Sequence, residues 1–324
     1  MSDKHDWLLG IDIGGTTIKL AFVNKEGVIV HKWEIITRTE EKGLHIISDI
    51  GKSVRAKLEE WQDGNLIGAG LGAPGPVDFE TGAIYVAVNI GWKDYPLKEL
   101  LEKELGIPTV VDNDANIASF GEFWKGAGRG SNDLVCITLG TGVGGGVIAN
   151  KHLIHGVSGA AGELGHITVK PEGGAPCNCG KTGCVETIAS ATGIVRLAME
   201  EIKRNQDSAI AAIFKESGLI TSKDVVDCAA SGDQASLDVL DEVAKYLGLA
   251  AANVGNVINP DMIVFGGGVS KAGDIILKPI EKYFKQYAFP RVAESTELKV
   301  ASLGNDAGVI GAAGLIMQQL GEEI

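Results

Sequence analysis

The sequence predicts an α/β protein built from two domains. Segments with the apolar pattern of strands alternate with segments of helical spacing along the whole chain. The 324 residues correspond to two domains at roughly 100–200 residues each. A weak repeat relates Ile11–Asn24 to Ile137–Asn150, because both segments run from a strand through a glycine turn into a second strand. A duplication would place two equivalent turns in two domains, facing each other across a cleft, whereas the alternative is a chance likeness between glycine-rich hairpins.

The individual elements follow from local patterns. Apolar runs bounded by turn residues predict strands at Trp7–Ile13, Ile18–Val23, Val28–Ile36, Leu66–Gly72, Pro108–Asp112, Leu134–Leu139, Gly146–Asn150 and Met262–Phe265. Apolar residues three and four positions apart predict helices at His45–Trp61, Pro96–Leu105, Ala115–Trp124, Gln234–Ile258 and Asn305–Leu320.

Glycine is unusually frequent, with 45 of 324 residues, about 14%, against an ordinary share of ~7%. There are only 9 prolines and no Gly-X-Y period, so collagen and low-complexity disorder are excluded. We therefore expect the excess glycines to mark places where the backbone must approach phosphate, sugar or a metal closely.

The charge balance restricts the possible partners. The net charge of −13 makes general binding of nucleic acid or of an anionic membrane surface unfavourable. The N-terminus shows no apolar core of a signal peptide, and the longest uncharged stretch, Leu134–Asn150, is too short to span a membrane. We expect a cytoplasmic protein that binds neither nucleic acid nor membranes.

Three glycine-rich segments follow predicted strands. In the first, Asp12–Thr17, two glycines allow backbone N–H groups to approach an anion, and Asp12 could hold Mg²⁺ through its water shell. In the second, Leu139–Gly146, five glycines would cost much chain entropy in a simple connection, so close approach to phosphate is the simplest reason for them. The third, Phe265–Val269, could pass beneath a flat ring such as adenine. An ordinary turn is the alternative at the first and third segments.

A cysteine cluster is the most specific motif. Cys177, Cys179 and Cys184 lie within eight residues, which in a reducing compartment indicates a metal rather than disulfides. Tetrahedral Zn²⁺ needs a fourth ligand, for which His166 is the nearest candidate, although His152 and His155 are also near. Such a site has no open position, so the zinc would be structural.

Polar residues also follow the strand that ends near Asp112. In the segment Asp112–Asn116, a carboxylate could act as a catalytic base or only as a helix cap, and spacing alone favours the cap. By themselves, Glu163 and Glu186 would be ordinary surface acids.

Taken together, these motifs closely resemble the ATP-dependent glucokinases of the ROK family, of the Gram-positive bacterial type. The motifs that carry the resemblance are Asp12–Thr17, Pro74–Val77, Asn113–Ala115, Leu139–Gly146, Gly156–His166, Cys177–Cys184 and Gly266–Gly268. The resemblance implies an actin-like, hexokinase-like (ribonuclease H-like) duplicated fold with ATP and sugar in a central cleft. It further implies a small domain of residues 1–115 plus 305–324 and a large domain of residues 116–304 with a zinc segment at 166–184.

The resemblance also assigns roles to residues. It implies that Asp114 is the catalytic base and that His166 uses one ring nitrogen for zinc and the other for a sugar hydroxyl. The implied sugar contacts are Gly75, Asn89, Asn113, Asp114, Glu163, His166 and Glu186. The implied contacts to Mg-ATP are Asp12, Gly14, Gly15, Thr16, Thr17, Gly140, Thr141, Gly142 and Gly267. The implied zinc ligands are His166, Cys177, Cys179 and Cys184.

The activity implied by the resemblance is transfer of the γ-phosphate of Mg-ATP to the 6-hydroxyl of glucose, at the entry to glycolysis. A ROK kinase for mannose, N-acetylmannosamine or fructose is the alternative, because the residues that bind hydroxyls are shared among sugars. A sugar-sensing ROK repressor without its DNA-binding domain is less favoured, as is an actin-like filament protein or chaperone. Family members are often dimers or tetramers, so we expect a homodimer or homotetramer.

Overall fold

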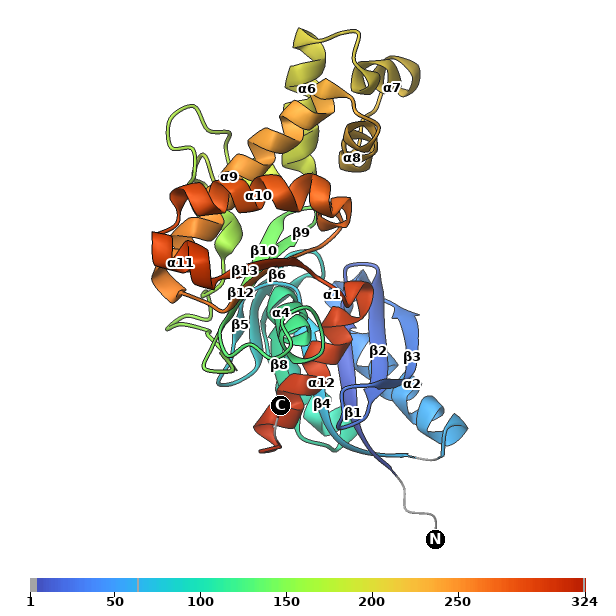
Figure 1. The fold of residues 1–324 in the computed structure, drawn as a ribbon. Helices are drawn as coiled ribbons and strands as arrows, with labels where there is room; N and C mark the ends of the chain where they lie inside the picture. The colour runs from blue at the N-terminus through green and yellow to red at the C-terminus, as the bar shows by residue number, and fades with distance from the viewer. Residues whose placement is uncertain (1–4, 63, 323) are drawn as a thin grey trace. The chain divides into compact units, whose positions relative to one another are not determined.

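The computed structural model describes residues 5–62, 64–322 and 324, so the first four residues of the N-terminus considered above lie outside it. The chain forms two compact units, whose segments can be found by residue number with the colour bar of Figure 1. Unit 1 consists of Met1–Gly130, Leu153–Ala161 and Leu303–Ile324, and unit 2 of Ser131–His152 and Gly162–Ser302. Helix α4 (Asp114–Trp124), within which the sequence-based boundary after residue 115 falls, lies wholly in unit 1.

The central sheet of unit 1 has five strands in the order β3-β2-β1-β4-β8. Their bounds are β1 (His5–Ile13), β2 (Thr17–Val23), β3 (Ile29–Ile36), β4 (Gly64–Ala73) and β8 (Thr109–Asn113). The pairs β1–β2 and β2–β3 are antiparallel, whereas β4 runs parallel to both β1 and β8. All five strands were predicted from the sequence.

Alternating side chains of β1 build two different cores on the two faces of this sheet. Trp7, Leu9 and Ile11 pack on one face with α2 (Ile46–Glu60) and α3 (Leu97–Leu105). Leu8 belongs to the core of the other face, which α12 (Ala307–Gln319) covers (Figure 1). The three helices were predicted, and they give unit 1 the layered α/β architecture that the sequence indicated.

Several glycines serve the packing of α12 rather than a ligand. A Cβ at Gly10 in β1 would lie 1.9 Å from the Val309 carbonyl oxygen, and one at Gly70 in β4 only 1.7 Å from that of Ala312. These contacts let the helix backbone rest directly on the strands. Glycines outside the proposed substrate and metal segments therefore include some that make the close helix–sheet contact possible.

A small antiparallel sheet in unit 1 was not predicted. It consists of β5 (Val77–Asp78), β6 (Ala83–Ala87) and β7 (Trp92–Tyr95). The short segment α1 (Glu40–Gly43), in which Glu41 and Lys42 have positive φ, precedes α2. The strands of the small sheet are short, and adjacent residues of β6 such as Tyr85 and Val86 are both exposed, so the two-residue alternation of a half-buried strand is lacking.

The sheet of unit 2 repeats the arrangement of unit 1, with the order β11-β10-β9-β12-β13. Its strands are β9 (Leu134–Leu139), β10 (Val143–Ala149), β11 (His152–Leu153), β12 (Met262–Gly266) and β13 (Glu297–Val300). As in unit 1, the first strand pairs antiparallel with the second, here β9 with β10, and β12 runs parallel to both β9 and β13. The matching order supports the duplication that the weak repeat suggested.

Helices provide most of the remaining chain of unit 2. They are η1 (Leu164–His166), α5 (Glu186–Ala189), α6 (Ala191–Arg204), α7 (Ala209–Ser217), α8 (Ser222–Ala230), α9 (Gln234–Ile258), η2 (Val269–Ala272), α10 (Asp274–Tyr287) and α11 (Pro290–Ser295). The long α9 packs against α6, α8 and α10 in one core. The last short turn, η3 (Gly304–Asp306), precedes α12 in unit 1.

Within the described part of the chain, the helices lack the combination of length and apolar character needed to cross a membrane.

The second glycine segment is shorter as a turn than the sequence suggested. Strand β10 begins at Val143, not at Gly146, so Gly144–Gly146 belong to the strand and pair with Thr138–Cys136 of β9. A Cβ at Gly145 would lie 2.6 Å from the Leu164 side chain, so packing explains this glycine. Only residues 140–142 remain as a turn that could receive a phosphate.

Candidate functional site

The first glycine turn joins β1 to β2 in unit 1. The Gly14 N–H donates to the Thr17 carbonyl at 3.0 Å, which closes the turn. Thr37, just after β3, braces it from the neighbouring strand, because its N–H donates to the Thr16 carbonyl at 2.9 Å and its hydroxyl to the Gly14 carbonyl at 2.7 Å. Gly15 and Thr16 are exposed. The turn is thus a fixed, accessible backbone segment that can offer N–H groups to an anion.

Asp12 brings a carboxylate to the base of this turn. The Lys19 ammonium, opposite it across β1 and β2, lies 3.9 Å from Asp12 Oδ2. Burial raises the pKa of the Asp12 carboxyl above its usual value, and the nearby Lys19 charge opposes that rise. A partly buried carboxylate with one distant cationic partner fits a further cation, so the residue suits the predicted Mg²⁺ role.

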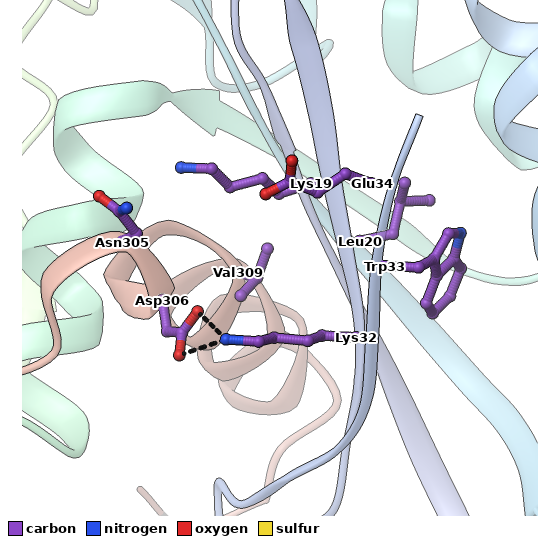
Figure 2. Close-up of a pocket in the computed structure, with 8 residues that line it drawn as sticks. All are labelled: Lys19, Leu20, Lys32, Trp33, Glu34, Asn305, Asp306 and Val309. Atoms are coloured by element: carbon purple, nitrogen blue, oxygen red, sulfur yellow. Dashed lines mark hydrogen bonds and ion pairs between the residues drawn. The ribbon is translucent and has the colours of Figure 1, made fainter. Parts of the chain in front are cut away.

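Lys19 also lines a cavity of about 280 Å³ between β2, β3 and the start of α12, shown in Figure 2. Within it, Lys32 donates to both carboxylate oxygens of Asp306, at 2.9 and 3.0 Å (Figure 2). Glu34 stands opposite Lys19 in the β2–β3 pairing. Because two carboxylates balance two ammonium groups, the cavity does not concentrate positive charge for a phosphate, and we assign it no substrate.

Three segments meet at one edge of the unit 1 sheet. The parallel strands β1, β4 and β8 end there side by side, since Asp12 pairs with Gly72 and Ala73 with Asn113. The Asn113 side-chain amide donates to the Gly75 carbonyl at 3.1 Å. Gly75 has a φ of +93°, a conformation that favours glycine. Ligands of α/β proteins commonly bind at such an edge, so this is the candidate site of unit 1.

At the start of α4, the residue that caps the helix and the candidate catalytic base are neighbouring but different residues. Asn113 is the N-cap, and its Oδ1 accepts the Ala115 N–H at 2.8 Å. Asp114 Oδ1 accepts the same N–H at 2.8 Å, and the side chain of Asp114 is exposed. Asn113 is thus the N-cap residue, where spacing favoured a carboxylate, and the exposed Asp114 side chain lies at the first position of the helix.

A partly buried pair of a histidine and a carboxylate supports this turn, and it was not predicted from the sequence. His155 Nε2 lies 2.6 Å from Asp112 Oδ2, while Asp112 Oδ1 accepts hydrogen bonds of 2.7 Å from the Asn113 N–H and the Asn116 side chain. The bond to Asp112 raises the pKa of His155 above its usual value, against the opposing effect of burial. The partners are 43 residues apart, so no local pattern could have revealed them.

Asn89 lies in the exposed turn that follows β6. The Val86 carbonyl oxygen of that strand would be 2.1 Å from a Cβ at Gly75, so the strand before Asn89 packs against the Gly75 turn. The structure therefore places Asn89 in the neighbourhood of the sheet edge, on a different element from the other candidates.

In unit 2, the second glycine turn and the third glycine segment are neighbours. The Gly140 N–H donates to the Gly142 carbonyl at 2.9 Å, and the Gly140 carbonyl accepts the Ala191 N–H of α6 at 2.9 Å. Gly267 follows β12, which is parallel to β9, and has a φ of +87°. A Cβ there would lie 2.3 Å from the Leu139 carbonyl oxygen. The candidate adenosine and phosphate contacts of this unit thus share one sheet edge.

The structure brings the four predicted zinc ligands together. The ligand atoms of His166, Cys177, Cys179 and Cys184 all lie within 4.8 Å of one another. His166 Nδ1 is 3.5 Å from Cys177 Sγ, and the sulfurs of Cys179 and Cys184 are 3.7 Å apart. Of the histidines considered, His166 is the one that lies beside the three cysteines, and its role as a zinc ligand stays a prediction.

The two alternative histidines have other partners. His152 Nδ1 lies 2.8 Å from the Asn150 carbonyl oxygen, and His155 pairs with Asp112 in unit 1.

The cluster fits zinc by distance and by chemistry. Zinc bonded to sulfur at ~2.3 Å and to nitrogen at ~2.0–2.1 Å in a tetrahedron separates two sulfurs by about 3.8 Å and sulfur from nitrogen by about 3.5 Å. The 3.7 Å between the sulfurs of Cys179 and Cys184 and the 3.5 Å between Cys177 Sγ and His166 Nδ1 match these values. Burial raises the pKa of the Cys184 thiol to about 12, whereas the Lys181 N–H lowers that of Cys179. Zn²⁺ would hold all three sulfurs as thiolates.

The two acids near the cluster differ in their contacts. Glu163 Oε2 is 3.8 Å from His166 Nε2, the ring nitrogen that faces away from Cys177. This carboxylate is exposed, so the pair could share a polar ligand. Glu186 instead accepts the Val143 N–H at 3.0 Å through Oε2.

Two α/β units with the same sheet order, each with a glycine turn after its first strand, define a protein of the actin-like, hexokinase-like class. The sequence model described as the ROK family matches residues 8–319. The chain belongs to the ROK family.

Similar proteins with assigned activities cover nearly the whole chain. A glucokinase from Halalkalibacterium halodurans is 55% identical over 321 residues, which cover 98% of this chain and 97% of that protein. The crystal structure of a ROK family glucokinase from Streptomyces griseus in complex with glucose and AMPPNP has a TM-score of 0.78 at 36% identity, covering 95% of this chain and 98% of that one. A xylose repressor from Caldicellulosiruptor bescii is 28% identical, over 97% of this chain and 78% of that protein.

Proposed function

We propose that this chain is an ATP-dependent glucokinase, which transfers the γ-phosphate of ATP to the 6-hydroxyl of glucose. The observation that carries this function is the 55% identity to the H. halodurans glucokinase over nearly the full length of both proteins. The similarity to the S. griseus structure, which contains glucose and AMPPNP, supports the same pair of substrates.

In this proposal Asp114 orients the attacking hydroxyl and accepts its proton. A carboxylate is a weak base toward an alcohol, so the proton moves late, when the bond from oxygen to phosphorus is already forming. The exposed carboxylate and the capped turn that carries it support the assignment. The other proposed sugar contacts are Gly75, Asn89, Asn113, Glu163, His166 and Glu186.

The glycine turns would bind the nucleotide through backbone N–H groups, which suit the charge that spreads over the phosphate oxygens. The proposed contacts are Gly14, Gly15, Thr16 and Thr17 in unit 1, and Gly140, Thr141, Gly142 and Gly267 in unit 2. Asp12 would hold Mg²⁺ through its water shell. When bound, Mg²⁺ neutralises charge on the phosphates.

The decisive experiment replaces Asp114. We expect Asp114→Asn to lower kcat by about 10²–10⁴-fold, because the amide cannot accept the proton. It can still accept the Ala115 N–H, so the start of α4 and the melting temperature should be retained. Glucose-dependent ADP formation is the measurement, and a variant that keeps more than about a tenth of kcat would remove Asp114 from this role.

A substrate panel tests the identity of the sugar and of the donor. We expect the highest kcat/KM with glucose and ATP among glucose, mannose, N-acetylmannosamine and fructose, each with ATP or polyphosphate. A higher value for another hexose would identify a different kinase of the family. Sugar binding without ADP formation would instead identify a sugar-sensing protein.

We also propose that His166, Cys177, Cys179 and Cys184 hold one structural Zn²⁺. Elemental analysis should find one zinc per chain, and a folded protein without metal whose three cysteines react with a thiol reagent would refute this. Free thiols and the use of ATP support a cytoplasmic location. A homodimer or homotetramer remains the predicted assembly, to be measured by light scattering.

A further inference from the structure

The Glu186 carboxylate contacts both the second glycine turn and a proposed zinc ligand. Its Oε2 accepts the N–H of Val143, the first residue of β10. A Cβ at Gly142 would lie only 2.5 Å from the same oxygen, so the carboxylate packs directly on the turn. Its Oε1 is 3.8 Å from Cys177 Sγ. An ordinary sugar contact does not require either of these contacts.

The two segments that carry the zinc ligands both lie against the start of β10. Gly165, in the turn that ends at His166, approaches so closely that a Cβ there would be 2.0 Å from the Val143 carbonyl oxygen. Glu186 follows Cys184 by two residues and begins α5. Thus the carbonyl of Val143 lies against the segment that carries His166. The N–H of Val143 donates to Glu186, which follows the segment that carries the three cysteines.

The chain after α5 holds the rest of the turn. The Ala191 N–H donates to the Gly140 carbonyl at 2.9 Å, and the Thr192 hydroxyl to the Thr141 carbonyl at 3.4 Å. With two carbonyls engaged by α6 and the Val143 N–H by Glu186, the orientation of the peptide groups in the turn is fixed. A backbone that is already oriented loses less entropy when it binds an anion.

We propose that Glu186 is a positioning residue for the nucleotide, which holds the turn at residues 140–142 in the conformation that receives phosphate, and that zinc acts on the turn through Glu186. The inference rests on the proposed function, which assigns this turn to ATP. It assigns Glu186 an effect on nucleotide binding that a sugar contact would not have. Zinc then contributes to substrate binding as well as to stability.

Two substitutions separate the positioning role from a sugar contact. Glu186→Ala removes the acceptor for the Val143 N–H, and we expect AMPPNP affinity measured by calorimetry without sugar, together with the KM for ATP, to worsen about tenfold. Glu186→Gln keeps an acceptor oxygen and should recover nucleotide affinity to within about threefold of the unmodified protein. Glu281→Ala on α10, where the carboxylate pairs with Lys285 on the surface, is the matched control and should change neither value.

The opposite pattern would overturn the inference. If both Glu186 variants bind AMPPNP as the unmodified protein does and lose only glucose affinity, Glu186 is a sugar contact. Zinc content and melting temperature are measured on each variant. If Glu186→Ala has lost zinc, Glu186→Gln is compared with Glu186→Met instead. If Glu186→Gln then binds AMPPNP no better than Glu186→Met, the inference is also contradicted.

The zinc connection is tested without turnover. We expect removal of zinc by a chelator to speed hydrogen exchange in the peptide that contains residues 139–147, and added zinc to restore the protection. Unchanged exchange there, with exchange altered only around residues 166–184, would contradict the connection. Because both readouts omit catalysis, they are separate from the proposed function, which fails instead if the unmodified protein forms no ADP with glucose.

Discussion

The glycine turns of the two units occupy equivalent positions but are stabilised by different means. In unit 1, charged residues of the adjoining strands face each other, since Asp12 lies opposite Lys19. In unit 2 the residue that corresponds to Asp12 is Thr138, and it pairs with Gly144. Neither of these two residues has an ionisable side chain. A carboxylate from a different part of the chain, that of Glu186, accepts the N–H of Val143 directly after this second turn.

This difference indicates how a duplicated fold can divide one binding task. A charge pair at the first turn suits a cation, because a partly buried carboxylate is stabilised by any positive neighbour. A turn of uncharged backbone suits an anion, because N–H groups approach it without a competing side chain. The same sheet order therefore supports a proposed metal-binding role of Asp12 beside the phosphate contacts of the turn in unit 1, and proposed phosphate binding without a metal-binding carboxylate at the matching position in unit 2.

Among the changes that compare the two turns, the largest expected effect comes from removing the charge of the first turn. We expect Asp12→Asn to lower kcat about 100-fold and to raise the Mg²⁺ concentration needed for half-maximal activity, since a neutral amide holds the hydrated cation poorly. Thr138→Val, the matched change in unit 2, should lower kcat by less than about threefold. Kinetics over a range of Mg²⁺ concentrations measure both, and equal losses would remove the proposed division between the units.

A smaller effect should separate glycines needed for a ligand from glycines needed for packing. No described atom outside the adjacent residues lies within 4 Å of the Cβ position of Gly15, and its φ is not in the positive region. We expect Gly15→Ala to leave the melting temperature unchanged and to weaken ATP binding about tenfold, because only a bound phosphate would meet the methyl group. Gly142→Ala should affect both, since its Cβ would displace the Glu186 carboxylate.

Calorimetry of ATP binding and thermal unfolding measure the effects of Gly15→Ala and Gly142→Ala. Gly10→Ala in β1 is a useful reference, because its Cβ would clash with the Val309 backbone and should lower the melting temperature most. If Gly15→Ala binds ATP normally, the first turn does not approach the nucleotide.

Local patterns in the sequence predicted much of this fold for physical reasons. The strands of both central sheets have continuous or alternating apolar side chains because each is covered by helices, and α9 was predicted with its observed bounds because its apolar stripe repeats at helical spacing. The helices between residues 186 and 230 were missed, although Ser190, Ser208 and Thr221 cap three of them and gave a usable signal.

The candidate site divides in the same way. The proposed zinc ligands could be picked out because three of them lie within eight residues, and the turn with Asn113 and Asp114 follows a recognisable strand. The bonds of His155 to Asp112 and of Glu186 to Val143 could not, since each joins residues 43 positions apart whose meeting depends on tertiary packing. Side chains that orient a site are therefore harder to predict than those that form it.

The smallest expected effect concerns pH and the support of unit 1. The bond to Asp112 raises the pKa of His155 above its ordinary value of 6.5, so the charged pair stabilises the folded state fully below that pH. This contribution is lost as the pH rises through the folded-state pKa, where the neutral ring still donates a hydrogen bond. His155→Gln keeps a donor but not the charge, so it should cost about 1 kcal/mol near pH 6 and almost nothing near pH 9. Urea unfolding at both pH values measures this, with His152→Gln, whose ring lies against the Asn150 carbonyl instead of a carboxylate, as the control. If the loss of unfolding free energy is equal at the two pH values, His155 supports the turn by its shape and hydrogen bond alone. The charge of Asp12 would then be the one charge that distinguishes the support of the two turns.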